Sequence, residues 1–87
     1  MIGVVQIEFK LFANLTEYLP AGARGHSVLL DVPDGTTIYE VMDRFHVPHE
    51  EAHLIFRNGI FVPHSERDSY KLQEGDALAL WPPVAGG

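Results

Sequence analysis

The chain reads TIYEVMDRF from Thr37 to Phe45, and this pattern predicts the helix against which the rest of the domain packs. Thr37 and Glu40 have the spacing of a capping box, in which a hydroxyl and a carboxylate satisfy backbone amides at the start of a helix. Behind this cap, apolar residues recur with the period of one helix face. They are Ile38, Val41, Met42 and Phe45. A helix must bury such a face, and we expect it to lie on a sheet.

Turn signals flank the predicted helix. Pro33-Asp34-Gly35 precedes it and is a strong turn sequence. Val47-Pro48 is expected to end it, because the residue before a proline is driven out of the helical region of backbone angles.

Two strands are predicted before the helix. From Val4 to Phe12, apolar residues alternate with polar ones, as in a strand with one buried face. Ser27 to Val32 has β character as well. Between the two, Ala13 to Leu19 predicts a short connection with about one helical turn.

Three strands are predicted after the helix. His53 to Arg57 and Ile60 to Val62 flank Asn58-Gly59, and this dipeptide is a strong short-range hairpin signal. The polar residues Pro63 to Lys71 predict a loop. The last strand runs from Ala77 to Trp81.

Five strands and one long helix predict an α+β fold, in which the helix covers one face of a mixed sheet. On the last strand, Leu78 and Leu80 share one face, and Ala79 and Trp81 share the other. If the leucines meet the helix, Trp81 lies outside, at the base of the C-terminal tail. An exposed aromatic residue there suits an interface anchor. It can equally fold over the tail prolines, and the sequence favours neither.

The composition excludes several classes of protein. The chain has no cysteine, so disulfides, thiolate metal sites and a cysteine nucleophile are excluded. The net charge is −6 and the few fixed cations are scattered, so we expect no nucleic-acid partner. A basic protein surface would be attracted instead. No apolar run spans a membrane and no signal-peptide pattern is present, so we expect a cytoplasmic protein with no membrane partner.

The chain ends in Pro82-Pro83-Val84-Ala85-Gly86-Gly87. The two prolines cannot continue a sheet and give a stiff, extended stalk. The two glycines have no side chain, so the end of the chain fits a narrow channel and offers only the Gly87 carboxylate. We therefore divide the chain into a domain, residues 1–81, and a flexible functional tail, residues 82–87.

The histidines and serines of the chain do not indicate an enzyme. His46, His49 and His53 lie close together in the sequence, and three imidazoles can bind zinc. Pro48 interrupts the helix that would align the first two, so we expect solvent-facing histidines and no metal site. The serines lie in no nucleophile-elbow motif, which argues against a hydrolase.

Taken together, these motifs resemble the ubiquitin-like sulfur carriers of the MoaD/ThiS family. The resemblance rests on the Pro-Asp-Gly-Thr-Thr turn before the helix, the Asn-Gly hairpin, the Glu-Gly-Asp turn before the last strand and the Pro-Pro-Val-Ala-Gly-Gly ending. It spans essentially the whole chain, and the ending is most similar to that of the small subunit of molybdopterin synthase. The resemblance implies a β-grasp fold, with a mixed five-stranded sheet packed on one main helix.

The resemblance also implies a carrier in place of an enzyme. A ubiquitin-activating-type partner would use ATP and magnesium to adenylate the Gly87 carboxylate, and a persulfide donor would convert it to a thiocarboxylate. The large subunit of molybdopterin synthase, or an analogous acceptor, would then take the sulfur. By the same resemblance the carrier binds no cofactor itself, Pro82 to Gly87 is the tail inserted into partners, and Trp81 and Ala79 lie on the partner-binding surface.

Two alternatives stay open. The chain can be a carrier of the thiamine type, another sulfur carrier or a ubiquitin-like protein modifier. It can also be a ubiquitin-like interaction module that binds through its sheet and never uses its terminus.

Overall fold

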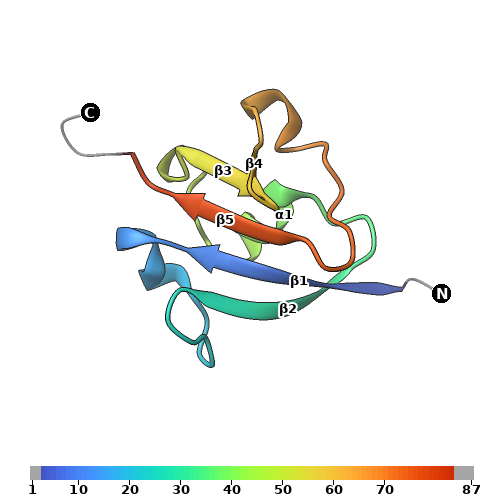
Figure 1. Cartoon of the computed structure of the whole chain (residues 1–87), viewed down its shortest axis with the longest axis horizontal. Helices are drawn as coiled ribbons and strands as arrows, with labels where there is room; N and C mark the ends of the chain where they lie inside the picture. Colours follow the sequence, from blue (N-terminus) through green and yellow to red (C-terminus); the bar gives the residue numbers. More distant parts are fainter. Residues whose placement is uncertain (1–2, 84–87) are drawn as a thin grey trace.

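The computed structural model describes residues 3–83, and they form one five-stranded sheet with the strand order β2-β1-β5-β3-β4 (Figure 1). The strands are β1 (Val4–Leu11), β2 (Ser27–Pro33), β3 (Leu54–Arg57), β4 (Ile60–Phe61) and β5 (Ala77–Trp81). Strands β1 and β5 are parallel, and the other neighbouring strands are antiparallel. The predicted mixed sheet is therefore confirmed, as is the number of its strands. Short 3₁₀ helices lie in the connections, namely η1 (Ala13–Tyr18), η2 (His49–Glu51) and η3 (His64–Glu66).

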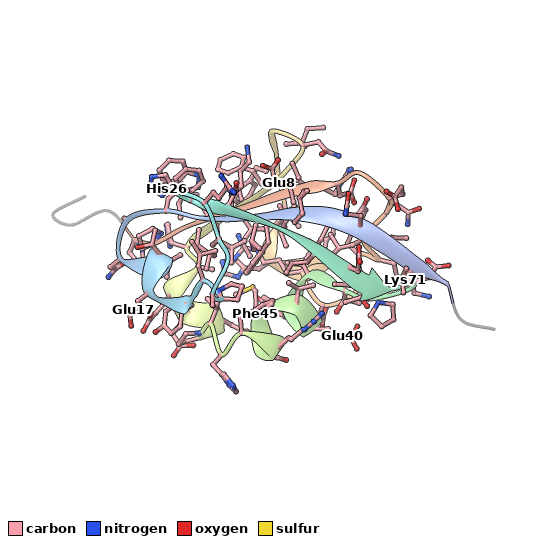
Figure 2. The ribbon with its side chains drawn as sticks, turned by 90° about the horizontal axis from the view of Figure 1, so that it is seen from below. Glu8, Glu17, His26, Glu40, Phe45 and Lys71 are labelled. Atoms are coloured by element: carbon pink, nitrogen blue, oxygen red, sulfur yellow. The ribbon has the colours of Figure 1, made fainter. Side chains whose placement is uncertain are left out.

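Helix α1 (Ile38–Arg44) covers one face of this sheet. Figure 2 shows α1, which carries Glu40, on one side of the sheet, with Glu8 and His26 on the other. Three helix residues are fully buried with the two leucines of β5 in a single core, as the apolar stripe predicted. They are Ile38, Val41 and Met42, packed with Leu78 and Leu80. Trp81 consequently lies on the face away from the helix.

The start of α1 is the predicted capping box. The hydroxyl oxygen of Thr37 accepts a hydrogen bond from the Glu40 amide at 3.3 Å, and the Glu40 carboxylate accepts one from the Thr37 amide at 2.8 Å. The cap satisfies amides that have no partner inside the helix.

The end of α1 differs from the prediction, because the helix stops at Arg44 and not at Val47-Pro48. His46 has a left-handed backbone with φ of 62°. Its amide donates to the Asp43 carbonyl at 3.1 Å, and the Val47 amide donates to the Met42 carbonyl at 2.9 Å. These two bonds form a Schellman motif, which closes a helix without help from a proline. Glycine usually occupies the position of His46, so this helix end could not be predicted from the residue types.

The segment predicted as a polar loop contains a buried arginine. Arg67 has no exposed surface, and its guanidinium donates to the carbonyls of Val62, Ala52 and His53 at 3.0, 3.3 and 3.3 Å. These bonds tie the end of the hairpin to the residues that lead into β3. The loop is thus an ordered part of the scaffold.

A buried carboxylate fixes the start of β5. Asp76 is only 4% exposed, and it accepts hydrogen bonds from the Asn58 amide group, the Tyr70 hydroxyl and the Gln73 backbone amide at 2.9, 3.2 and 2.8 Å. Asn58 and Gly59 have φ of 53° and 82°, as a two-residue hairpin turn requires. The predicted hairpin is therefore confirmed, and Asp76 joins it to the last strand.

No helix within residues 3–83 combines the length and the apolar character needed to cross a bilayer.

We call Asp76 and its hydrogen-bond partners Asn58, Tyr70 and Gln73 the Asp76 cluster. This cluster predicts a loss of stability at alkaline pH. Burial, and then the negative charge of Asp76, raise the pKa of Tyr70 above its ordinary value of 10.0. The folded state therefore favours the protonated phenol, and this contribution is complete below the unfolded pKa and lost as the pH rises through the higher folded pKa. We expect the free energy of unfolding to fall as the pH rises past about 10, and Tyr70→Phe to make this fall shallower.

Urea unfolding at a series of pH values measures the effect. Tyr39→Phe is the matched control for the loss of a phenol, because Tyr39 lies outside the Asp76 cluster. Equal slopes for the parent and Tyr70→Phe would contradict the prediction.

Candidate functional site

The sheet face away from α1 carries a set of apolar side chains around the end of β5. In the strand register, Ala79 of β5 pairs with Phe56 of β3, which pairs with Phe61 of β4, and Trp81 pairs with Leu54. Directly paired residues project to the same face of a sheet. We call these five residues the apolar patch: Leu54, Phe56, Phe61, Ala79 and Trp81.

The apolar patch is open to solvent. Trp81 is 40% exposed and Phe61 is 46% exposed, while the other three residues are half-buried. The rings of Phe56 and Phe61 meet edge to face, with centroids 6.1 Å apart. A group of exposed aromatic residues on a small domain is typical of a protein-binding surface.

Trp81 does not stand alone on this surface. Its ring stacks on Phe12 with centroids 3.9 Å apart and only 2° between the planes, and Phe12 stacks in turn on His26 at 5.0 Å. The Phe12 amide also donates to the Leu80 carbonyl at 3.2 Å. Trp81 is therefore both exposed and held in one orientation by its stack on Phe12.

Phe12 and His26 were not recognised from the sequence as part of this site. One signal was available for Phe12, because it continues the phase of Gln6, Glu8 and Lys10, the face of β1 that points away from the core. A large apolar residue in the polar phase of a strand indicates a contact outside the main core.

A pair of opposite charges borders the apolar patch. Lys10 pairs with Ala79 across β1 and β5, and its ammonium group lies 3.7 Å from the Glu8 carboxylate. Both side chains are 37% exposed, so solvent screens their attraction and the pair remains free to rearrange against a partner.

The tail begins directly beside Trp81. Pro82 is half-buried and Pro83 is exposed, and both follow β5 without an intervening turn. The predicted tail residues Val84, Ala85, Gly86 and Gly87 lie outside the described residues. The division into residues 1–81 and 82–87 therefore stays a prediction.

The three histidines after the helix do not come together. His46 and His53 are exposed, whereas the Nε2 atom of His49 lies 2.7 Å from Asp43 Oδ1 and its ring stacks on Tyr39 at 3.8 Å. Within residues 3–83, no three histidine or carboxylate side chains are grouped as metal ligands would be. The described residues give no support to a zinc site.

A comparison with family models shows to which protein family the chain belongs. The ThiS family model matches residues 9–87, which include both the apolar patch and the whole tail. The chain belongs to the ThiS family. A comparison with curated proteins gives no significant match.

Solved structures place this ThiS-family protein among ubiquitin-like β-grasp proteins. The HVO 2177 protein of Haloferax volcanii is 26% identical, with a TM-score of 0.75 over 98% of this chain and 89% of that one. SAMP1 of the same organism, a small archaeal modifier protein, is 29% identical, with a TM-score of 0.64 over 94% and 99% of the two chains.

A more distant match supports the fold alone. It is a complex of subunits 1 and 2 of molybdopterin-converting factor from Helicobacter pylori, where the matched chain is 16% identical, with a TM-score of 0.56 over 95% of this chain and 100% of that one. The β-grasp fold expected from the sequence is confirmed.

The aromatic stack predicts a fluorescence change. Trp81 is the one tryptophan of the chain, so the emission spectrum reports its surroundings alone. Phe12→Ala removes the ring that covers one face of the indole, and we expect a red-shifted emission and a loss of about 1 kcal/mol in the free energy of unfolding. The control is Phe61→Ala, which removes an exposed ring of the same kind that is not stacked on Trp81. Equal spectra for Phe12→Ala and the parent would contradict the stacked geometry.

Proposed function

We propose that this ThiS-family protein is a sulfur carrier whose Gly87 carboxylate is adenylated and then converted to a thiocarboxylate. The observation that supports this most is the extent of the family match, which runs to Gly87 and so includes the Gly-Gly ending. The described structure agrees with the role, because the strand that leads into the tail lies in the middle of the sheet and ends at an apolar patch.

The proposed chemistry needs an activated terminus. A carboxylate oxygen of Gly87 attacks the α-phosphorus of ATP and releases pyrophosphate, with magnesium held by the activating enzyme. The terminal sulfur of a persulfide then attacks the acyl carbonyl and AMP leaves. A thiol cleaves the resulting acyl disulfide, which leaves the thiocarboxylate on Gly87 and a disulfide on the donor.

The chain supplies the substrate for these steps and none of the catalysts. Gly87 has no side chain next to the carbonyl that is attacked, so an enzyme channel can enclose it closely. The sequence has no cysteine, so the persulfide and the resolving thiol must belong to partners. We place these reactions in the cytoplasm.

The acceptor we favour is a partner like the large subunit of molybdopterin synthase. Subunits 1 and 2 of the Helicobacter pylori factor are seen as a complex, and one chain of that complex has the fold of this chain. In such a complex, Trp81 and Ala79 with the rest of the apolar patch would contact the partner while the tail enters its active site. The net charge of −6 favours a partner with a basic rim.

A protein modifier is the second candidate, and the similarity to SAMP1 favours it. The same acyl adenylate, or a thioester made from it, can be attacked by a lysine amine to form an isopeptide bond. A carrier of the thiamine type would use the same tail with another acceptor. These functions share the activation step and differ only in the group that takes the acyl or sulfur product.

Intact mass spectrometry tests the proposal. After incubation with ATP, magnesium, an activating enzyme and a persulfide donor, the protein should gain the mass difference between sulfur and oxygen, located at Gly87. Deletion of Gly86 and Gly87 is the matched control and should abolish the gain, with an unchanged circular dichroism spectrum. The proposal fails if the parent protein shows no gain, or if the protein isolated from its own cells continues beyond Gly87.

Binding measurements test the apolar patch separately from the tail. Trp81→Ala should weaken binding to the activating enzyme by about 2 kcal/mol, as expected for a buried aromatic anchor. Glu50→Ala changes an exposed residue of η2 outside the apolar patch and should bind like the parent. Titration calorimetry measures both affinities, and equal affinities for parent and Trp81→Ala would remove Trp81 from the interface.

A further inference from the structure

The two outer strands of the sheet, β2 and β4, each have an edge that pairs with no other strand of residues 3–83. In an antiparallel pair, alternate residues bond to the neighbour and the others direct their N–H and C=O groups to the free side. The phase of β2 follows from the bonds at its two ends. The Leu11 amide donates to the His26 carbonyl and the Asp34 amide donates to the Gly3 carbonyl, each at 2.9 Å.

With this phase, every second residue of β2 directs its backbone N–H and C=O groups outward, away from β1. The residues that bond to β1 are Val28, Leu30 and Val32, and the outward residues are Ser27, Leu29, Asp31 and Pro33.

Both ends of the outer edge of β2 are already occupied. The Ser27 amide and carbonyl exchange hydrogen bonds with Arg24 at 3.1 and 2.9 Å. Pro33 has no N–H, and its carbonyl accepts from the Thr36 amide and hydroxyl at 3.1 and 2.6 Å. These contacts prevent a long strand from pairing along the whole edge.

The middle of the edge is left available. Neither the N–H and C=O groups of Leu29 nor the N–H of Asp31 has a hydrogen-bond partner on the outer side among residues 3–83. The Asp31 carbonyl accepts one long bond of 3.4 Å from the exposed side chain of Arg44. We call Leu29–Asp31 the free edge. Strand β4 offers a shorter unpaired edge. The Val62 amide donates to the Ile55 carbonyl at 2.8 Å, so within β4 only Phe61 directs its backbone N–H and C=O groups to the free side.

A pocket adjoins the free edge on the helix side. It has a volume of about 390 Å³ and lies between the end of β2, the turn that follows it and α1. Pro33 and Val41 contribute apolar surface to it, and Glu40 and Arg44 contribute charge. On the other side of the sheet, Leu29 is 63% exposed. A strand added here would place its side chains alternately in the pocket and beside Leu29.

Charge decides what kind of strand fits. Exposed carboxylates lie near the free edge at Asp31, Asp34 and Glu40, and they outnumber the cations at its two ends, Arg44 beside Asp31 and Arg24 beside Ser27. A second copy of this chain is disfavoured, because each copy has a net charge of −6. A segment with basic side chains is attracted to the same edge.

We propose that the free edge at Leu29–Asp31 binds an extended segment of a partner protein, with alternating apolar and basic residues, by β-strand addition. The backbone groups of Leu29 and Asp31 pair with the added strand, an apolar side chain enters the pocket, and a basic side chain faces Asp31. The proposal is independent of the chemistry at Gly87. Strand β1 separates the free edge from the apolar patch, so a partner held at this edge leaves the patch and Pro82 uncovered.

Nuclear magnetic resonance on the labelled full chain tests the proposal, with a synthetic five-residue peptide of alternating lysine and valine as the probe. The peptide should slow hydrogen exchange at the Leu29 and Asp31 amides. The Leu30 amide, which already bonds to β1, is the internal control and should not change. A peptide with glutamate in place of lysine should bind about fivefold more weakly, because it meets like charges at a solvent-exposed surface.

Two variants sharpen the test. Leu29→Pro removes an outward N–H that the β1–β2 ladder does not use, so it should abolish peptide binding in a folded protein. Asp31→Lys should reverse the preference between the lysine and glutamate peptides, and it decides the matter if Leu29→Pro fails to fold.

Three results would overturn the proposal. One is an effect of the peptide on the apolar patch with none at Leu29 and Asp31. Another is unchanged binding by folded Leu29→Pro or an unchanged preference in Asp31→Lys. The third is protection of the Leu29 amide with rising protein concentration in the absence of peptide, which would make a second copy the occupant.

Discussion

Strand β5 is paired on both of its sides, with β1 in parallel and with β3 antiparallel, and the positions of the apolar patch and of the start of the tail depend on this pairing. Leu78 and Leu80 are fully buried beneath α1. Because side chains alternate along a strand, Ala79 and Trp81 must then face the open side. A slip of one residue would turn the leucines to solvent, so the core itself fixes both the apolar patch and the place where the tail leaves the sheet.

The two ends of β5 are held by different kinds of contact. At its start, Asp76 collects hydrogen bonds from the hairpin and from its own turn, and Asn58 accepts a bond from the Ala77 amide at 2.8 Å. At its end, Trp81 stacks on Phe12 at 3.9 Å. A strand held at both ends presents Pro82 and Pro83 in one direction, and in the proposed function this would reduce the ordering cost of inserting the tail into a partner.

Local patterns in the sequence were sufficient to predict the strands and the start of the helix, and to predict which residues of β5 share a face. The capping box at Thr37 and the Asn58-Gly59 turn depend on residues a few positions apart, and alternation alone placed Ala79 and Trp81 on the open face. Long-range contacts and contacts to backbone groups could not be predicted from these patterns. Arg67 bonds to carbonyls, which have no side-chain signature, and Phe12 meets Trp81 only because β1 and β5 are neighbours in the sheet. His46 ends the helix at a position where glycine would have signalled it.

The proposed carrier function and the alternative modifier function share one physical step. Thiocarboxylate formation and isopeptide formation both start from an acyl group activated at a terminal glycine, and they differ in the nucleophile that the partner provides. The chain cannot supply that nucleophile as a thiol, because it has no cysteine. Under the proposed function and the proposed strand addition, the chain selects its partners through the apolar patch beside the tail and the acidic free edge of β2. The choice between the two chemistries would then be made by the protein that binds these surfaces.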